Sequence, residues 1–182
     1  MICLIGFLKL RKRFEMAEID FFQARCQQGP LTAALFGLCD DQNSTPAYAD
    51  TTTPQKWIAQ VHNRGQRAVV FTAIDKCVMA DQQEPGRGRC DGMLTADNLL
   101  YLVELKDRKT DSTWKTDAIA QLVSTIEFLQ THHDLSPFRH KKAYVSNKKK
   151  PCFVTIEHEQ RARFFRTHGF RLDIHTQIVI DA

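Results

Sequence analysis

The sequence predicts an α/β fold in which a mixed central sheet is flanked by helices. Two segments, residues 67–79 and 91–106, consist of short runs rich in apolar and β-branched residues, which is typical of strands. The segment 114–132 instead repeats apolar residues at helical spacing. The chain has 182 residues and is 43% hydrophobic, so we expect one domain over residues 1–182 with a sizeable core.

The first third of the chain is predicted to be mostly helix and loop. Apolar positions in residues 7–27 predict an amphipathic helix that ends at Gln28-Gly29-Pro30. Residues 31–38 are an apolar helix or buried turn, and residues 40–54 form a polar loop that covers a site or merely connects. A short helix over 54–63 follows, with Pro54 at its first position. Because Met16 is also a plausible translation start, we treat residues 1–15 as a possible non-native or dispensable extension.

The middle of the chain predicts a three-strand meander. Residues 67–79 form its first strand, interrupted by Asp75 and Lys76, and a turn rich in Gly and Pro follows. Asp91 opens the second strand, which turns at residues 95–98 into the third strand, 99–106. We expect the three strands to be mostly antiparallel.

The last third alternates helices and strands. After the helix 114–132, residues 141–147 predict a strand that lies beside the strand 99–106 after a helical crossover. A strand near 153–156, a helix over about 157–167 capped by Gly169, and one final strand complete the prediction.

Charged side chains stand at the end of the otherwise apolar strand 99–106. Side chains alternate along a strand, so Leu100, Leu102, Glu104 and Lys106 share one face. Burying charges there is costly unless they are paired or coordinate a metal. If Asp91 lies on the neighbouring strand, two carboxylates and a lysine converge, and two carboxylates with water suit Mg²⁺. The alternative is an exposed strand end with both charges solvated.

The spacing Asp91-x(12)-Glu104-Leu105-Lys106 resembles the PD-(D/E)xK nuclease superfamily, with its restriction-endonuclease-like αβββαβ core. The resemblance implies that Asp91 and Glu104 bind Mg²⁺, with Mn²⁺ as a substitute, and that the Leu105 carbonyl often joins them. It also implies that Lys106 assists the attacking water. Cys90 stands where the family name has Pro, a residue that many members lack. Some branches carry a glutamine on the following helix, which Gln121 matches in type and position; otherwise it is an ordinary helix-flank residue.

These residues lead to an expected function with two competitors. The resemblance implies a metal-dependent nuclease that acts on nucleic acid, DNA rather than RNA, in restriction, repair or defence against phage. A catalytically silent interaction subunit with the same fold is the alternative. A small-molecule enzyme is a weaker option, because neither a phosphate-cradling Gly-rich loop nor a nucleophile triad is visible.

Several further residues are candidates for supporting roles. Arg87 and Arg89 precede Asp91 and are placed for phosphate contacts, although loop arginines are common without a ligand. The stretch 139–150 has six Lys or Arg and no acid, and it suits either a backbone-binding track or a solvated turn. Its candidate nucleic-acid contacts are Lys141, Lys142 and Lys148. An additional acid facing the metal is sought among Glu15, Glu18, Asp20 and Asp75, each of which is more often simply solvated.

Composition limits partners and location. The formal net charge of +4 permits nucleic-acid binding without demanding it. Six scattered cysteines without a C-x-x-C pair predict reduced thiols, no structural zinc and a cytoplasmic location. No apolar run approaches the roughly 20 residues of a membrane span, so we expect no membrane contact. A homodimer or a protein partner is possible.

Overall fold

A six-stranded mixed sheet forms the centre of the protein, in a computed structural model that describes residues 19–108, 113–149 and 158–180. Its strand order is β1-β5-β6-β7-β8-β9. The first four strands are antiparallel neighbours, whereas β8 and β9 join in parallel register. The bounds are β1 Gln27–Leu31, β5 Val69–Ala73, β6 Gly92–Ala96, β7 Leu99–Lys106, β8 His140–Asn147 and β9 Arg171–Ile174.

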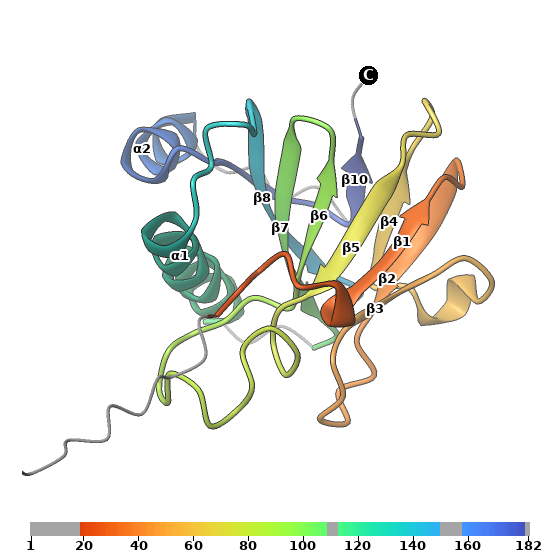
Figure 1. Ribbon diagram of the computed structural model, residues 1–182, viewed down its shortest axis with the longest axis horizontal. Coiled ribbons are helices and arrows are strands. Elements are labelled where there is room, and N and C mark those ends of the chain that lie inside the picture. Colours follow the sequence, from red (N-terminus) through yellow and green to blue (C-terminus); the bar gives the residue numbers. More distant parts are fainter. Residues whose placement is uncertain (1–18, 109–112, 150–157, 181–182) are drawn as a thin grey trace, which may run out of the picture.

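A second, four-stranded sheet packs against one face of the first, and both helices cover the other face (Figure 1). The strand order of the second sheet is β10-β4-β2-β3, with β10 parallel to β4 and the other pairs antiparallel. The bounds are β2 Leu35–Cys39, β3 Tyr48–Asp50, β4 Ala59–His62, β10 Gln177–Val179, α1 Trp114–His132 and α2 His158–His168.

The alternation of side chains along β7 creates two apolar cores, one on each face of the central sheet. Leu100 and Leu102 face the helices and pack with Leu122 and Ile126 of α1. The opposite face of β7 packs against the second sheet. The β7 side chains on this face are all fully buried or nearly so: Leu99, Tyr101, Val103 and Leu105. β7 is therefore covered on both sides, and its exposed-strand alternative is wrong.

The α/β prediction is confirmed for the second half of the chain. The meander β5-β6-β7 is antiparallel, α1 follows, and β8 lies parallel to β7 as expected. Helix α2 ends before Gly169, whose φ of 72° is the left-handed conformation that favours glycine. The single last strand is instead two strands, β9 and β10, which belong to different sheets. The strand predicted near 153–156 lies outside the described residues.

The predictions for the first third of the chain are wrong where the structure describes it. Residues 24–26 form one 3-10 turn, and Gln28-Gly29-Pro30 lies inside β1 and does not end a helix. Residues 31–38 contain most of β2, the loop 40–54 contains β3, and the short helix 54–63 is a 3-10 turn followed by β4. Ala59 and Val61 are buried while Gln60 is exposed, an alternation of period two that belongs to a strand.

A disulfide joins Cys26, just before β1, to Cys77, in the segment that follows β5. The prediction that all six thiols are reduced is therefore wrong for this pair. Cys39 and Cys90 are free and buried. Among the described residues, neither helix is long and apolar enough to cross a bilayer.

Candidate active site at the ends of β6 and β7

The β6–β7 hairpin places Asp91 beside Glu104. Gly92 pairs with Val103, so one further step of the antiparallel register sets Asp91 opposite Glu104. The backbone N–H of Leu105 donates a 2.5 Å hydrogen bond to Asp91 Oδ2. The two carboxylates predicted from the sequence are thus held together by the strands that carry them.

Glu104 is the most unusual charged residue of this site because its side chain is fully buried. Lys106 Nζ forms an ion pair with Glu104 Oε1. Apart from this pair, neither carboxylate oxygen has a hydrogen-bond partner among the described residues. Burial, followed by the negative charge of Asp91, raises the pKa of Glu104 well above its usual range. Acceptor oxygens left without donors in this way suit a bound cation.

Burial also raises the pKa of Asp91, to about 7. The hydrogen bond from the Leu105 N–H and the charge of Lys106 oppose this shift, whereas Asp40 and Asp75 add to it. A raised pKa produced by burial and by like charges is common where a protein positions carboxylates for chemistry or for a cation.

Helix α1 fixes this end of the hairpin through two side chains one turn apart. Gln121 Oε1 accepts a 2.9 Å hydrogen bond from Lys106 Nζ, and Gln121 Nε2 donates a 3.1 Å bond to the carbonyl of Arg89. Thr125 Oγ1 accepts a 2.9 Å bond from the N–H of Cys90. Gln121 thus lies at the carboxylate site, where the sequence analysis placed it, and contacts Lys106. Through Gln121 and Thr125, α1 also holds the backbone directly before Asp91.

Two further acids lie near enough to affect the carboxylates. Asp75, one of the sequence candidates, raises the pKa of both Asp91 and Glu104, but its own carboxylate lies 3.5 Å from Arg89 and 3.8 Å from Lys76. Asp40 follows β2 in the second sheet and was not predicted. No local signal distinguished Asp40 from the other polar residues of 40–54, because its approach to Asp91 depends on how the two sheets pack.

The predicted phosphate contacts before Asp91 are engaged within the chain. The Arg87 guanidinium stacks 4.7 Å from the centre of the Phe128 ring and pairs with Glu84 at 3.2 Å. Arg89 is 9% exposed and donates to the carbonyls of Met79 at 3.1 Å and Gln83 at 2.9 Å. Arg89 therefore orders the segment between β5 and β6. Nucleic-acid contacts by either arginine stay predictions.

The structure divides the lysines predicted to bind nucleic acid. The Lys148 N–H donates a 2.9 Å hydrogen bond to the Lys106 carbonyl, so Lys148 follows the end of β8 beside the site. Lys141 and Lys142 pair with Leu100 and Tyr101 at the other end of β7. These two lysines therefore lie three to four strand positions from Glu104, about half the length of β7.

The acids predicted near the N-terminus do not complete the described site. Asp20 is exposed, and its carboxylate accepts a 2.8 Å hydrogen bond from the nearby Phe22 N–H. Glu15 and Glu18 lie outside the described residues.

The oxygen donors of this site fit Mg²⁺ in their chemistry. Within the described ranges, no group of three or more His, Cys, Asp or Glu side chains is arranged to hold a metal ion. Mg²⁺ is commonly bound through one or two protein carboxylates and keeps several waters, so the pair Asp91 and Glu104 suffices. Glu104 Oε2, which has no partner among the described residues, and Oε1, which pairs with Lys106, are the oxygens that could coordinate the cation.

Comparison of the chain with protein-family models, with curated proteins and with solved structures gave no match. The function of this protein is therefore inferred from the geometry of the site and from the sequence pattern.

Proposed function

We propose that this protein is a metal-dependent nuclease of the PD-(D/E)xK type with a restriction-endonuclease-like core. One observation carries the proposal: Asp91, Glu104, Lys106 and Gln121 meet at the ends of β6 and β7, and apart from the ion pair with Lys106 the Glu104 oxygens have no hydrogen-bond donor among the described residues. The order β5-β6-β7-α1-β8, with β8 parallel to β7, supports the same assignment. The helix expected before this meander is not present among residues 54–63.

The proposed roles follow from charge and position. Asp91 and Glu104, with the Leu105 carbonyl, would hold Mg²⁺ or Mn²⁺, which supplies Lewis-acid activation of water and of a phosphodiester oxygen. Lys106 would stabilise the negative charge that develops on the attacking water and on the phosphate. Gln121 would orient Lys106, since its side-chain oxygen accepts from Lys106 Nζ. Arg87 and Lys148 would contact the nucleic-acid backbone.

The proposed substrate is nucleic acid, DNA in preference to RNA, in restriction, repair or phage defence. This choice depends on the family resemblance, because the formal net charge of +4 permits nucleic-acid binding but does not distinguish DNA from RNA. A homodimer or a protein partner would supply a second cut or target recognition. We also propose a cytoplasmic location, against which the Cys26–Cys77 disulfide is the opposing observation, because such bonds are rare in the cytosol.

A catalytically silent interaction subunit is the second candidate, and one contact favours it. Lys106 already pairs with Glu104 and donates to Gln121, so the charge of the site is partly neutralised within the chain. In a protein that binds no metal, Lys106 and Glu104 would form a buried ion pair with a structural role. Activity assays separate the two candidates.

The test is cleavage of plasmid DNA, single-stranded DNA and RNA by the full chain with Mg²⁺ or Mn²⁺. The proposal predicts cleavage that a chelator suppresses and that Lys106→Ala or Glu104→Gln abolishes. Lys56→Ala and Glu127→Gln are matched controls, because Lys56 is 54% exposed and Glu127 is an exposed residue of α1. Both controls should retain wild-type activity.

Two results would overturn the proposal. Cleavage that survives Lys106→Ala would assign the activity to another site or to a contaminant. Absence of cleavage by folded wild-type protein, across both metals and all three substrates, would favour the interaction subunit.

A further inference from the structure

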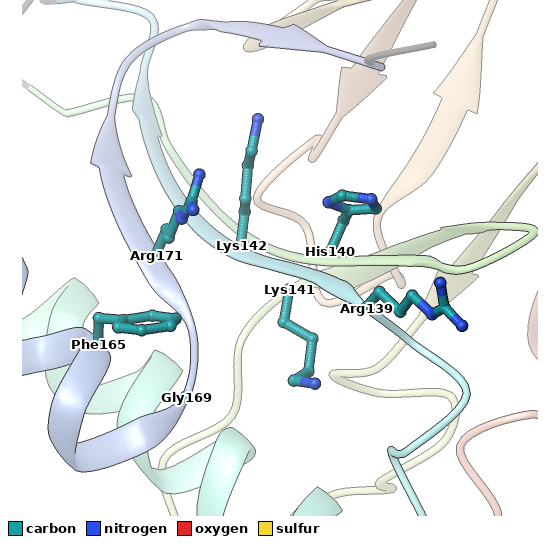
Figure 2. A pocket seen from close by; sticks show the side chains of 7 residues that line it. All are labelled: Arg139, His140, Lys141, Lys142, Phe165, Gly169 and Arg171. Carbon is teal, nitrogen blue, oxygen red and sulfur yellow. The ribbon is translucent and has the colours of Figure 1, made fainter.

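A basic groove lies between α2 and the edge of the central sheet, away from the carboxylate site. Two hollows of about 160 and 420 Å³ share Lys142, Phe165 and Arg171 as lining residues, and we call them together the β9 groove. Figure 2 shows the smaller of the two. Four further charged residues line the groove: Arg139, Lys141, Arg161 and Asp173.

The groove concentrates the positive charge of the protein. Five Lys or Arg side chains line it, against the single carboxylate of Asp173, which pairs with Arg161 at 2.8 Å. The groove thus carries a net charge of +4 with histidine neutral, which equals the formal charge of the whole chain. The remaining residues comprise twenty Lys or Arg and twenty Asp or Glu. An anionic ligand is therefore drawn to this groove.

Two of these cations are placed side by side by the sheet register. Lys142 of β8 pairs directly with Arg171 of β9. Figure 2 shows their side chains extending in the same direction from the two strands. The Lys142 ammonium lies 5.0 Å from the centre of the Tyr101 ring, whereas Arg171 is exposed. An anion bound beside the two would offset the repulsion of like charges on paired strands. Phosphate has the charge and the acceptor oxygens for this position.

An exposed aromatic ring completes the groove. Phe165 of α2 is 48% exposed, and it is the one Phe, Tyr or Trp classed as exposed within residues 19–108, 113–149 and 158–180. Its ring projects from α2 toward β9 (Figure 2). Cations beside an accessible aromatic ring are the arrangement on which single-stranded nucleic acid binds, because an unpaired base stacks on the ring while phosphates contact the cations. Duplex nucleic acid keeps its bases stacked inside and leaves such a ring unused.

We propose that the β9 groove binds single-stranded nucleic acid, with a base on Phe165 and phosphates on Arg171 and Arg139. The groove is separate from the carboxylates, because Lys142 precedes Val145, the strand partner of Glu104, by three positions and faces the other side of the sheet. At about 3.3 Å per residue three positions correspond to roughly 10 Å along β8. The proposal does not depend on cleavage, so it stands or fails independently of the nuclease assignment.

The test is fluorescence anisotropy of the full chain with labelled oligonucleotides of about 16 nucleotides, in chelator so that no cleavage occurs. The arms are single-stranded DNA, single-stranded RNA and duplex DNA. We expect either single strand to bind more tightly than the duplex. Phe165→Ala should weaken single-strand binding about 5-fold or more, and Phe165→Trp should restore it.

The salt dependence distinguishes a phosphate contact from a general loss of charge. Arg171→Gln should lower the slope of log affinity against log salt by about 0.7, the contribution of one contact to a single strand. Arg64→Gln is the matched control, because it removes the same charge from an exposed residue outside the groove and should leave the slope unchanged. Phe165 and Arg171 are both exposed, so thermal melts should show folded variants.

Two outcomes would overturn the proposal. Equal slopes for wild type and Arg171→Gln would show that Arg171 contacts no phosphate, and the proposed binding mode would be wrong. Duplex binding as tight as single-strand binding, with no effect of Phe165→Ala, would identify a general backbone-binding surface.

Discussion

Asp91→Asn should stabilise the metal-free protein at neutral and alkaline pH. Burial raises the pKa of Asp91 to about 7 in the folded protein, whereas an aspartate in the unfolded chain titrates near about 3.9. Between these values the folded state binds a proton that the unfolded state has released, so the free energy of unfolding falls as the pH rises. Below about pH 4 the carboxyl is protonated in both states and this cost disappears.

The size of the effect follows from the gap between the two pKa values. About three pKa units at about 1.4 kcal/mol per unit give about 4 kcal/mol, lost between about pH 4 and pH 7. Asparagine cannot ionise, and its side-chain oxygen can still accept from the Leu105 N–H. The variant should therefore match wild type near pH 4 and exceed it by up to about 4 kcal/mol near pH 8.

The assay is urea unfolding in chelator across this pH range, with the wild-type curve subtracted from that of the variant. Glu127→Gln is the control, because Glu127 is an exposed residue of α1 away from the carboxylate pair and its substitution should give a difference that hardly changes with pH. An Asp91→Asn protein that is less stable than wild type near pH 8 would refute the argument. So would a stability difference that does not vary with pH.

Three other substitutions test the packing that supports the site. Leu122→Ala should cost about 2–5 kcal/mol in denaturant unfolding, because Leu122 of α1 is fully buried against the central sheet; a cost below about 1 kcal/mol would contradict this packing. Gly92→Ala should cost about 1–3 kcal/mol or more by thermal unfolding, because a Cβ there would lie 2.4 Å from the Phe71 ring, and an unchanged melting temperature would argue against that contact. Cys26→Ser removes a disulfide whose cysteines are 51 positions apart, and it should lower the free energy of unfolding by about 4 kcal/mol under non-reducing conditions. An equal loss under reducing conditions would show that the packing of Cys26, and not its bond to Cys77, provides the stability.

The second half of the chain was predictable because its signals are long and local. Six of the eight residues of strand β7 are apolar or aromatic, which makes the strand too hydrophobic for an exposed edge. The buried positions Ala118, Leu122, Ile126 and Leu129 of α1 recur at helical spacing over about three turns. The same register that predicted a shared face for Glu104 and Lys106 also placed Asp91 beside them.

The first third was mispredicted because short apolar runs fit a strand as well as a helix. Strands β2, β3 and β4 have three to five residues each and are stabilised by partners far away in sequence. β4 lies between β2 and β10, and β10 comes more than a hundred residues later. No local pattern encodes such a neighbour.

The same limit applies to parts of the site. The approach of Asp40 to Asp91 and the pairing of Cys26 with Cys77 are products of tertiary packing. The separation of Lys141 and Lys142 from the carboxylates follows from the parallel register of β8 on β7, which a basic run in the sequence does not specify. Charge runs identify a basic surface without locating it.

Titration calorimetry with Mn²⁺ tests the central claim most directly, because it measures whether the buried carboxylates hold a metal without requiring the correct substrate. We expect Mn²⁺ binding near neutral pH that Asp91→Asn and Glu104→Gln both abolish and that Glu127→Gln, on the exposed face of α1, leaves intact. No binding by folded wild-type protein, or binding that survives both substitutions, would contradict a metal site at Asp91 and Glu104.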